Sequence, residues 1–355
     1  MIRAVATVDR GAIARNCERL RRALAGSTRL GVVVKADGYG HGAREAAAAA
    51  LAGGAQMLFV ATAMEAADLG SQPVPVVVMG ALTADELPVA LEAGAEVVVW
   101  DEGFLAGVPP GTRVHVKLDT GMGRLGTRDP AEATRMAEAA QERGCELAGL
   151  MTHFATADER DDTFFGEQLE RFRAWAEPLR ERFPEALLHA ANSAATLRDP
   201  ASHFDLVRCG VAIYGLDPFQ EHPSASELEP ALALRSWVAA VKACAAGEST
   251  GYGRRFVAQR DTVIATVPVG YGDGWRRGLT NNAEVVIGGR RFPLVGTVSM
   301  DNVTVELGPE AEARTGDAVT LIGEGITAEE VARRLDTINY EVTCGLTARV
   351  PREYV

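Results

Sequence analysis

Short apolar runs recur along the first 225 residues of the chain, and segments with helical character separate them. We identify about eight such runs, which cover residues 30–35, 57–62, 75–80, 96–101, 113–119, 147–153, 187–192 and 206–215. Their hydrophobicity is continuous rather than alternating. Because the strands of a parallel sheet are buried on both faces, this pattern is typical of parallel strands.

The segments between these runs carry helix start and stop signals. Residues 43–53 are nearly all alanine, residues 83–94 open on a threonine and close on a glycine, and residues 129–144 open on Asp-Pro and close on a glycine. A strand followed by a helix, repeated about eight times, predicts a (β/α)8 barrel of the TIM type. We assign this barrel to residues 1–225.

The pattern changes after a polar, proline-bearing linker at residues 221–230. Short segments rich in valine and threonine follow, and Gly-Gly and Asn-Asn pairs mark tight turns between them. We therefore expect a mostly-β domain over residues 226–355, with one helix at 327–336. The strand expected at residues 3–9 precedes the barrel and is free to pair with this second domain. The predicted fold class is α/β, a barrel followed by a β-rich domain.

Composition excludes several classes of protein. The net charge of -12 argues against a nucleic-acid binder. No apolar run approaches the roughly 18 residues that cross a bilayer, and the first residues lack an apolar signal core. The five cysteines are scattered without a CxxC pair, and the six histidines lack metal-site spacing. We expect a cytoplasmic protein that has no membrane segment, no nucleic-acid partner and no metal.

Polar residues gather where the expected strands end. In a (β/α)8 barrel these ends meet at one mouth, which carries the active site. The residues at these ends are Lys35, Lys117, Asp119, His153, Asn192, Ser193, Arg208 and Gly210. Any one of them is also explained as a solvated strand edge, and a strand-end lysine often extends its ammonium group to water. Together they favour a shared site.

The residue types suit an aldehyde cofactor such as pyridoxal phosphate. Burial lowers the pKa of a lysine and makes Lys35 a better nucleophile. Backbone N–H groups and hydroxyls near Ser193 and Gly210 are suited to a phosphate. His153 could stack on a pyridine ring, and Arg208 could donate to its nitrogen.

A glycine motif at residues 121–126, GMGRLG, suggests a different ligand. It matches the G-x-G-x-x-G pattern of dinucleotide-binding folds. In those folds the loop runs directly into a helix that binds the pyrophosphate. Here the helix signal at Asp129 comes only after the motif and two further residues, and the motif lies in the fifth unit rather than the first. The dinucleotide interpretation is therefore disfavoured.

Motifs along nearly the whole chain resemble those of the alanine racemases, which are fold-type III pyridoxal-phosphate enzymes. In order, they are VVVKADGYGHG, VKLDTGMGRLG, THFATAD, ANSAATL, VRCGVAIYG, GYGRRF, VPVGYGDGWRR, VSMDNVTVEL and TINYEVTCGLTARVPR. The resemblance implies interconversion of L-alanine and D-alanine, which supplies D-alanine for cell-wall peptidoglycan. It also implies a homodimer with shared active sites.

The resemblance also implies a role for each matching residue. Lys35 would bond to the cofactor and act as the base for D-alanine, and Tyr252 of the other subunit would be the base for L-alanine. Arg208 would donate to the pyridine nitrogen and leave it unprotonated, which favours return of a proton to Cα over transamination. Further cofactor contacts would come from Tyr39, His153, Asn192, Ser193, Gly210, Val211 and Tyr340. The remaining matches are Arg124 and Met300 for the substrate, Lys117 as a possible carbamate, and Asp158, Tyr271 and Arg277 at the entrance.

Three positions depart from the family pattern, namely Thr297, Ser299 and Arg255. Thr297 replaces an arginine that is frequent near the entrance, so the charge there is in doubt. Other functions stay open: a racemase for serine or for several amino acids, a fold-type III decarboxylase with Cys344 as its cysteine, and a pyridoxal-phosphate carrier without activity. The first of these fits the motifs better than the other two.

Overall fold

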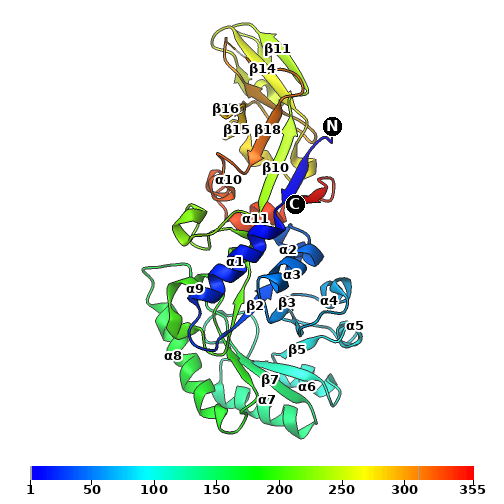
Figure 1. The fold of residues 1–355 in the computed structure, drawn as a ribbon, viewed down its shortest axis with the longest axis vertical. Coiled ribbons are helices and arrows are strands. Elements are labelled where there is room, and N and C mark those ends of the chain that lie inside the picture. The colour runs from blue at the N-terminus through cyan, green and yellow to red at the C-terminus, as the bar shows by residue number, and fades with distance from the viewer. Residues whose placement is uncertain (1, 311) are drawn as a thin grey trace.

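The computed structural model describes residues 2–310 and 312–355 and confirms the predicted barrel (Figure 1). Eight parallel strands follow the order β8-β7-β6-β5-β4-β3-β2-β9. Their bounds are β2 Arg29–Val33, β3 Met57–Val60, β4 Val76–Val78, β5 Glu96–Val99, β6 Arg113–Lys117, β7 Glu146–Met151, β8 Leu187–His189 and β9 Leu206–Cys209. The N–H groups of Asp205 and Arg208 donate to Leu188 (3.0 Å) and Ala191 (2.8 Å), which closes the ring between β8 and β9.

Helices cover the outside of the barrel (Figure 1). They are α1 Arg10–Ala23, α3 Ala43–Ala52, α4 Ala63–Leu69, α5 Glu86–Glu92, α6 Glu102–Gly107, α7 Pro130–Glu142, α8 Phe164–Ala176 and α9 Ser193–Arg198, whereas the short α2 Lys35–Tyr39 lies at the barrel mouth. The Asp-Pro signal is confirmed, because the Asp129 carboxylate accepts from the N–H of Ala131 at the start of α7 (2.9 Å). The helix expected from Thr83 is α5, whose first helical residue is Glu86. Thr83 caps it as predicted, because its hydroxyl accepts from the N–H of Glu86 (3.3 Å) and its own N–H donates to the Glu86 carboxylate (2.9 Å).

The second part of the chain forms a nine-stranded sheet of order β11-β14-β17-β16-β15-β18-β10-β1-β19. Its strands are β1 Val5–Val8, β10 Leu232–Trp237, β11 Ala240–Cys244, β14 Thr262–Val267, β15 Ala283–Ile287, β16 Arg290–Val295, β17 Val303–Glu306, β18 Ala318–Ile322 and β19 Arg352–Tyr354. A separate pair joins β12 Ser249–Thr250 to β13 Phe256–Val257. In the sheet, β1 pairs antiparallel with β10 and parallel with β19, so both ends of the chain lie in it.

Among the residues described in this part there are two α-helices, where the sequence predicts one. The expected helix is α10 (Ala328–Arg334), and the Thr327 hydroxyl accepts from the N–H of Glu330 at its start (3.2 Å). The second is α11 (Asn339–Cys344), whose six residues are too few for a periodic pattern. α11 packs on α2 so closely that a Cβ at Gly40 would collide with the Thr343 carbonyl. This contact brings the β-rich part to the barrel mouth.

Short 3-10 helices complete the fold: η1 Glu177–Arg180, η2 Pro200–Ser202, η3 Val211–Tyr214, η4 Pro223–Ser226, η5 Tyr252–Arg254, η6 Tyr271–Asp273 and η7 Arg277–Leu279. One buried apolar cluster extends from the barrel interior into the nine-stranded sheet. Among the described residues, no helix is both long enough and apolar enough to span a membrane.

Candidate active site

Lys35 lies on an unusual turn at the barrel mouth. β2 ends at Val33, and residues 36–39 then take positive φ values of 51°, 51°, 61° and 54°. Only one of these four is glycine, and a left-handed conformation is costly for other residues. Two side chains stabilise the turn: the Glu65 carboxylate accepts from the N–H of Ala36 (2.7 Å), and the Asp37 carboxylate accepts from the N–H of Ala43 (2.9 Å).

The mouth lowers the pKa of Lys35. Burial is the main cause, and the nearby Arg124 guanidinium adds to it, while Glu65 acts in the opposite direction. A lowered pKa increases the share of free amine, which is the form that attacks an aldehyde. This chain contains only three lysines, Lys35, Lys117 and Lys242. Two of them, Lys35 and Lys117, are at the predicted mouth.

Four cations surround His153, which follows β7. Burial holds its pKa well below the usual range, and the charges of Arg208, Lys117, Arg124 and Lys35 lower it further. All four charges therefore lie close enough to His153 to act on it, although they come from three different strands: Lys35 follows β2, Lys117 and Arg124 lie at and after the end of β6, and Arg208 lies in β9. A neutral imidazole surrounded by cations is suited to an anionic ligand with an aromatic ring.

Arg208, in β9, is 2% exposed and donates from both of its terminal nitrogens. Nη1 donates to the carbonyl and Nδ1 of His189 (2.8 and 2.9 Å), and Nη2 donates to the carbonyls of Thr152 and Ala190 (2.7 and 3.0 Å). Burial lowers its pKa to about 9, so it stays a cation at neutral pH. Within residues 2–310 and 312–355 no hydrogen bond engages its Nε, which remains available to a ligand.

A small cradle of hydroxyl and N–H groups lies at the start of η3. The Ser193 hydroxyl accepts from the N–H groups of Gly210 (3.0 Å) and Ala212 (3.3 Å). A Cβ at Gly210 would collide with the Tyr39 hydroxyl, and the Tyr39 ring lies 5.9 Å from that of Tyr340. The sequence places Val211 in the same loop, and Asn192 caps α9 beside it. Because the Ser193 hydroxyl only accepts in these two bonds, its own proton is left to donate, and a hydroxyl donor beside a closely packed glycine suits a phosphate.

Lys117 ends β6 and is 4% exposed. Its pKa falls to about 8, mainly because of burial and then because of the charges of Arg208 and Arg124. Asp119, two residues later, opposes this shift. In the described part of the chain, no carboxylate forms an ion pair with the Lys117 ammonium. Its environment therefore favours either the neutral amine or a modification that makes it an anion.

The glycine motif at 121–126 does not form a nucleotide loop. The N–H groups of Gly121 and Gly123 donate to the Asp119 carboxylate, each at 3.0 Å. Their donors are therefore directed at an acid of this chain rather than at a pyrophosphate. α7 begins only at Pro130, which agrees with the helix start predicted at Asp129, after the motif.

A second group of predicted residues lies exposed on the β-rich part. It comprises Tyr252, whose side chain is 74% exposed, together with Tyr271, Arg277 and Met300. In the chain as described, no hydrogen bond or ion pair joins this group to Lys35 or to the other mouth residues. Asp158 is also exposed, on the loop that follows β7. A single copy of the chain therefore does not unite the two groups.

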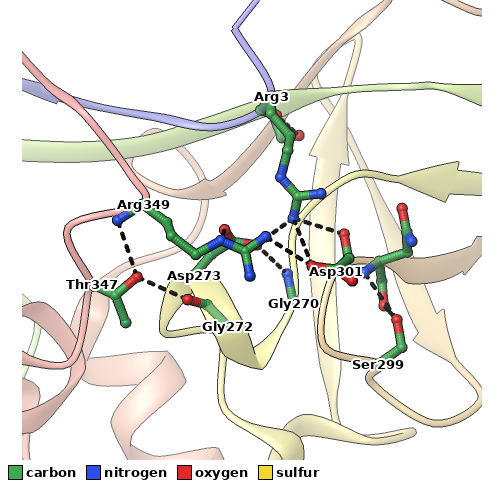
Figure 2. A network of polar contacts seen from close by, with 10 residues as sticks. Arg3, Gly270, Gly272, Asp273, Ser299, Asp301, Thr347 and Arg349 are labelled. Carbon is green, nitrogen blue, oxygen red and sulfur yellow. Dashed lines mark hydrogen bonds and ion pairs between the residues drawn. The ribbon is translucent and has the colours of Figure 1, made fainter.

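A polar network fixes the loops that carry Tyr271 and Met300 (Figure 2). The buried Asp273 carboxylate binds Arg3 Nη2 (2.6 Å) and Arg349 Nε (3.3 Å), and it accepts from the N–H of Gly270 (2.9 Å). Arg349 also pairs with Asp301 (2.8 Å). Residues from both ends of the chain thus hold one exposed face in a defined shape.

Several residues near the site are absent from the sequence prediction. Glu65 has a readable signal, because Thr62 and Glu65 form a capping box at the start of α4. His115 and His189 carry no such signal, since their meeting depends on barrel register. The contact of α11 with α2 also depends on tertiary packing.

These features define a class of protein: a (β/α)8-barrel enzyme whose mouth lysine is prepared to bond an aldehyde cofactor. Two family models match, alanine racemase N-terminal domain over residues 8–218 and C-terminal domain over residues 231–354. An alanine racemase from Symbiobacterium thermophilum is 42% identical over 98% of this chain and 96% of its own length. The chain belongs to the alanine racemase family.

Solved structures give the same result. An alanine racemase from E. faecalis has a TM-score of 0.93 and 38% identity, covering 100% of this chain and 98% of its own. One from Bartonella henselae, solved with covalently bound pyridoxal phosphate, has a TM-score of 0.89 and 27% identity, covering 100% of both chains. Pyridoxal phosphate is the cofactor of this family, and the lysine, the cradle and Arg208 fit it.

Proposed function

We propose that this chain interconverts L-alanine and D-alanine with pyridoxal 5′-phosphate, and so supplies D-alanine for peptidoglycan. The observation that carries the proposal is Lys35, held at the barrel mouth with a lowered pKa. The matching relatives named alanine racemase support the substrate, among them a Listeria monocytogenes protein at 39% identity over 98% of this chain.

The cofactor would be held by the mouth residues. Lys35 would bond to it, and His153 would cover its ring. Its phosphate would be held by Tyr39, Ser193, Gly210, Val211 and Tyr340. Asn192 would order the loop that carries this group. Arg208 would donate from Nε to the ring nitrogen. When bound, the cofactor withdraws electrons from the amino acid and makes the Cα proton removable. Because Arg208 stays protonated at neutral pH, it does not supply the ring nitrogen with a proton.

Two bases on opposite faces would then move the proton. Lys35 Nζ, freed when the substrate amine takes its place on the cofactor, would take or return it on one face, and Tyr252 Oη on the other. The exposure of Tyr252, and the lack of any hydrogen bond in the described chain between it and the mouth residues, favour a tyrosine supplied by a second copy. We therefore propose a homodimer with shared sites, in which Tyr271, Arg277 and Asp158 line the entrance and the Met300 N–H contacts the substrate carboxylate.

Lys117 is proposed to carry a carbamate. A bare ammonium here repels Arg124 and Arg208, whereas a carbamate attracts them. A pKa of about 8 supplies the free amine that reacts with carbon dioxide. The products are the carbamate anion and one released proton. Arg124 would then be oriented toward the substrate carboxylate and Tyr252.

Serine or a wider set of amino acids is the second candidate substrate. Thr297 is buried, and its hydroxyl donates to the Tyr252 carbonyl (2.6 Å). It therefore supports the position of Tyr252 rather than contributing to the charge at the entrance. Arg255 is exposed, close to Tyr252 in sequence. It is the one departure from the family pattern that bears on substrate access.

The test is chiral separation of the products formed by purified protein with pyridoxal phosphate. L-alanine, L-serine and L-lysine are incubated in parallel, with Lys35→Ala as the control. We expect D-alanine to approach a one-to-one mixture and Lys35→Ala to form none. Predominant D-serine would replace the proposed substrate, and release of an amine would replace the reaction class with decarboxylation.

A further inference from the structure

A buried line of polar side chains crosses the barrel interior below Arg208. Glu96 begins β5, at the end of the barrel opposite the mouth, and is 3% exposed. Its carboxylate lies 2.7 Å from His115 Nε2, His115 Nδ1 lies 2.9 Å from His189 Nε2, and His189 Nδ1 lies 2.9 Å from Arg208 Nη1. Both imidazoles are fully buried.

The chemistry of arginine fixes the direction of every hydrogen bond in this line. A guanidinium only donates, so His189 Nδ1 accepts and carries no proton. Burial and the charge of Arg208 hold the pKa of His189 well below its usual range, so the ring is neutral and its proton is on Nε2. That proton is donated to His115 Nδ1. The proton of His115 is therefore on Nε2 and is donated to Glu96.

The line ends on a stable anion. Arg113 Nε donates to the other oxygen of Glu96 (2.6 Å), and His115 and Arg113 together hold the pKa of this carboxylate below its usual value despite burial. The order is thus cation, two neutral rings and anion, and each link is satisfied. A buried line of this kind is stable only when every member has its partner.

The surrounding barrel leaves space for the two rings. They meet edge to face at 87°, with centroids 5.0 Å apart. Gly149 in β7 lies against both, and a Cβ there would collide with His115 Nδ1 and lie 2.8 Å from His189 Nε2. A metal site is not the explanation, because the described residues contain no group of three or more such side chains that could hold an ion.

We propose that Glu96 is a positioning residue that acts through His115 and His189 to hold Arg208 with its Nε directed at the ring nitrogen of the cofactor. This inference rests on the proposed function of Arg208. Nη1 is held by His189, and Nη2 is held by two carbonyls at the mouth. With both terminal nitrogens engaged, the guanidinium cannot rotate, and Nε is the donor left for the cofactor.

The first test determines which ring nitrogen of His115 and of His189 carries the proton. The full chain is labelled with 15N-histidine, and imidazole resonances are assigned with His115→Gln and His189→Gln. We expect both histidines to carry their proton on Nε2, before any substrate is added. A proton on Nδ1 of either ring reverses the line and overturns the proposal.

The second test compares two carboxylates that contact the same arginine. Glu146 Oε2 lies 3.1 Å from Arg113 Nη1 but is exposed and does not contact His115. In the holoenzyme, we expect Glu96→Gln to lower kcat about tenfold, to leave KM within about twofold, and to raise transamination relative to racemisation by about tenfold. Glu146→Gln should match the wild type in all three.

Equal behaviour of the two variants overturns the proposal, as does a Glu96→Gln variant that changes KM alone. If Glu96→Gln does not fold, the proton positions in the wild type decide. The proton positions are measured without substrate. A wrong prediction of these positions is therefore distinguishable from failure of the proposed function, in which the wild type would form no D-alanine.

Discussion

The Glu65 carboxylate accepts a hydrogen bond from the backbone N–H of Ala36, 2.7 Å away, and so binds the turn that carries Lys35 to the start of α4. The same carboxylate accepts from the N–H groups of Ala61 (2.7 Å) and Thr62 (3.2 Å). One side chain thus caps a helix and fixes a left-handed turn in the preceding βα unit.

Glu65→Ala should reduce activity because it loosens the turn that carries Lys35. Without the carboxylate the N–H of Ala36 has no such partner, and the left-handed residues 36–39 are less restrained. We expect kcat to fall about tenfold with little change in KM, because Lys35 is misplaced rather than removed. Steady-state kinetics on the holoenzyme measure this.

Thr62→Ala is the matched control for Glu65→Ala. It removes the other half of the capping box but leaves the contact with Ala36 intact. Both variants should lose about 1 kcal/mol in the free energy of unfolding, measured in urea. Only Glu65→Ala should lose kcat, and an equal loss in both would contradict a role in holding Lys35.

Gly210→Ala should weaken cofactor binding. The new Cβ collides with the Tyr39 hydroxyl and forces it away from the cradle that Ser193 helps to form. We expect the Kd for pyridoxal phosphate, from absorbance titration, to rise about a hundredfold. Gly166→Ala in α8 is the control, since a Cβ there meets nothing within 4 Å. Unchanged affinity in Gly210→Ala would argue against this cradle as the phosphate site.

Lys117 should bind carbon dioxide in a pH-dependent way. Its pKa of about 8 means that the amine is mostly protonated below that pH and free above it. With 13C-labelled carbon dioxide, we expect a carbamate NMR signal that grows from about pH 6 to about pH 9. Lys117→Arg should abolish the signal, whereas Lys242→Arg, at an exposed position of β11, should retain it. A signal that persists in Lys117→Arg would place the modification elsewhere.

Much of the fold could be predicted because buried segments are recognisable in the sequence as continuous apolar runs. Runs such as residues 57–60 are apolar on both faces because a sheet and helices enclose them, and the barrel rule then brings strand ends such as Lys35 and Arg208 to one mouth. The Gly288–Gly289 pair is an equally direct signal for a tight turn. It forms the two-residue turn between β15 and β16, with φ values of 57° and 77°.

Other features depend on contacts between distant segments. Ala36 gives no sign of its left-handed conformation, because the Glu65 carboxylate that stabilises it belongs to another unit. His115 and His189 are 74 positions apart and meet only because of barrel register. Tyr252 is predicted from the resemblance alone, since nothing in its local sequence indicates which mouth it faces.

Subunit complementation tests the central claim most directly. Lys35→Ala and Tyr252→Phe variants, each expected to be inactive, are mixed after unfolding and refolded together with pyridoxal phosphate. If two copies share their sites, half of the dimers contain one intact site, and D-alanine forms at about a quarter of the wild-type rate. If the mixture stays as inactive as the separate variants while wild-type protein treated alike recovers, Lys35 and Tyr252 do not act together across two copies.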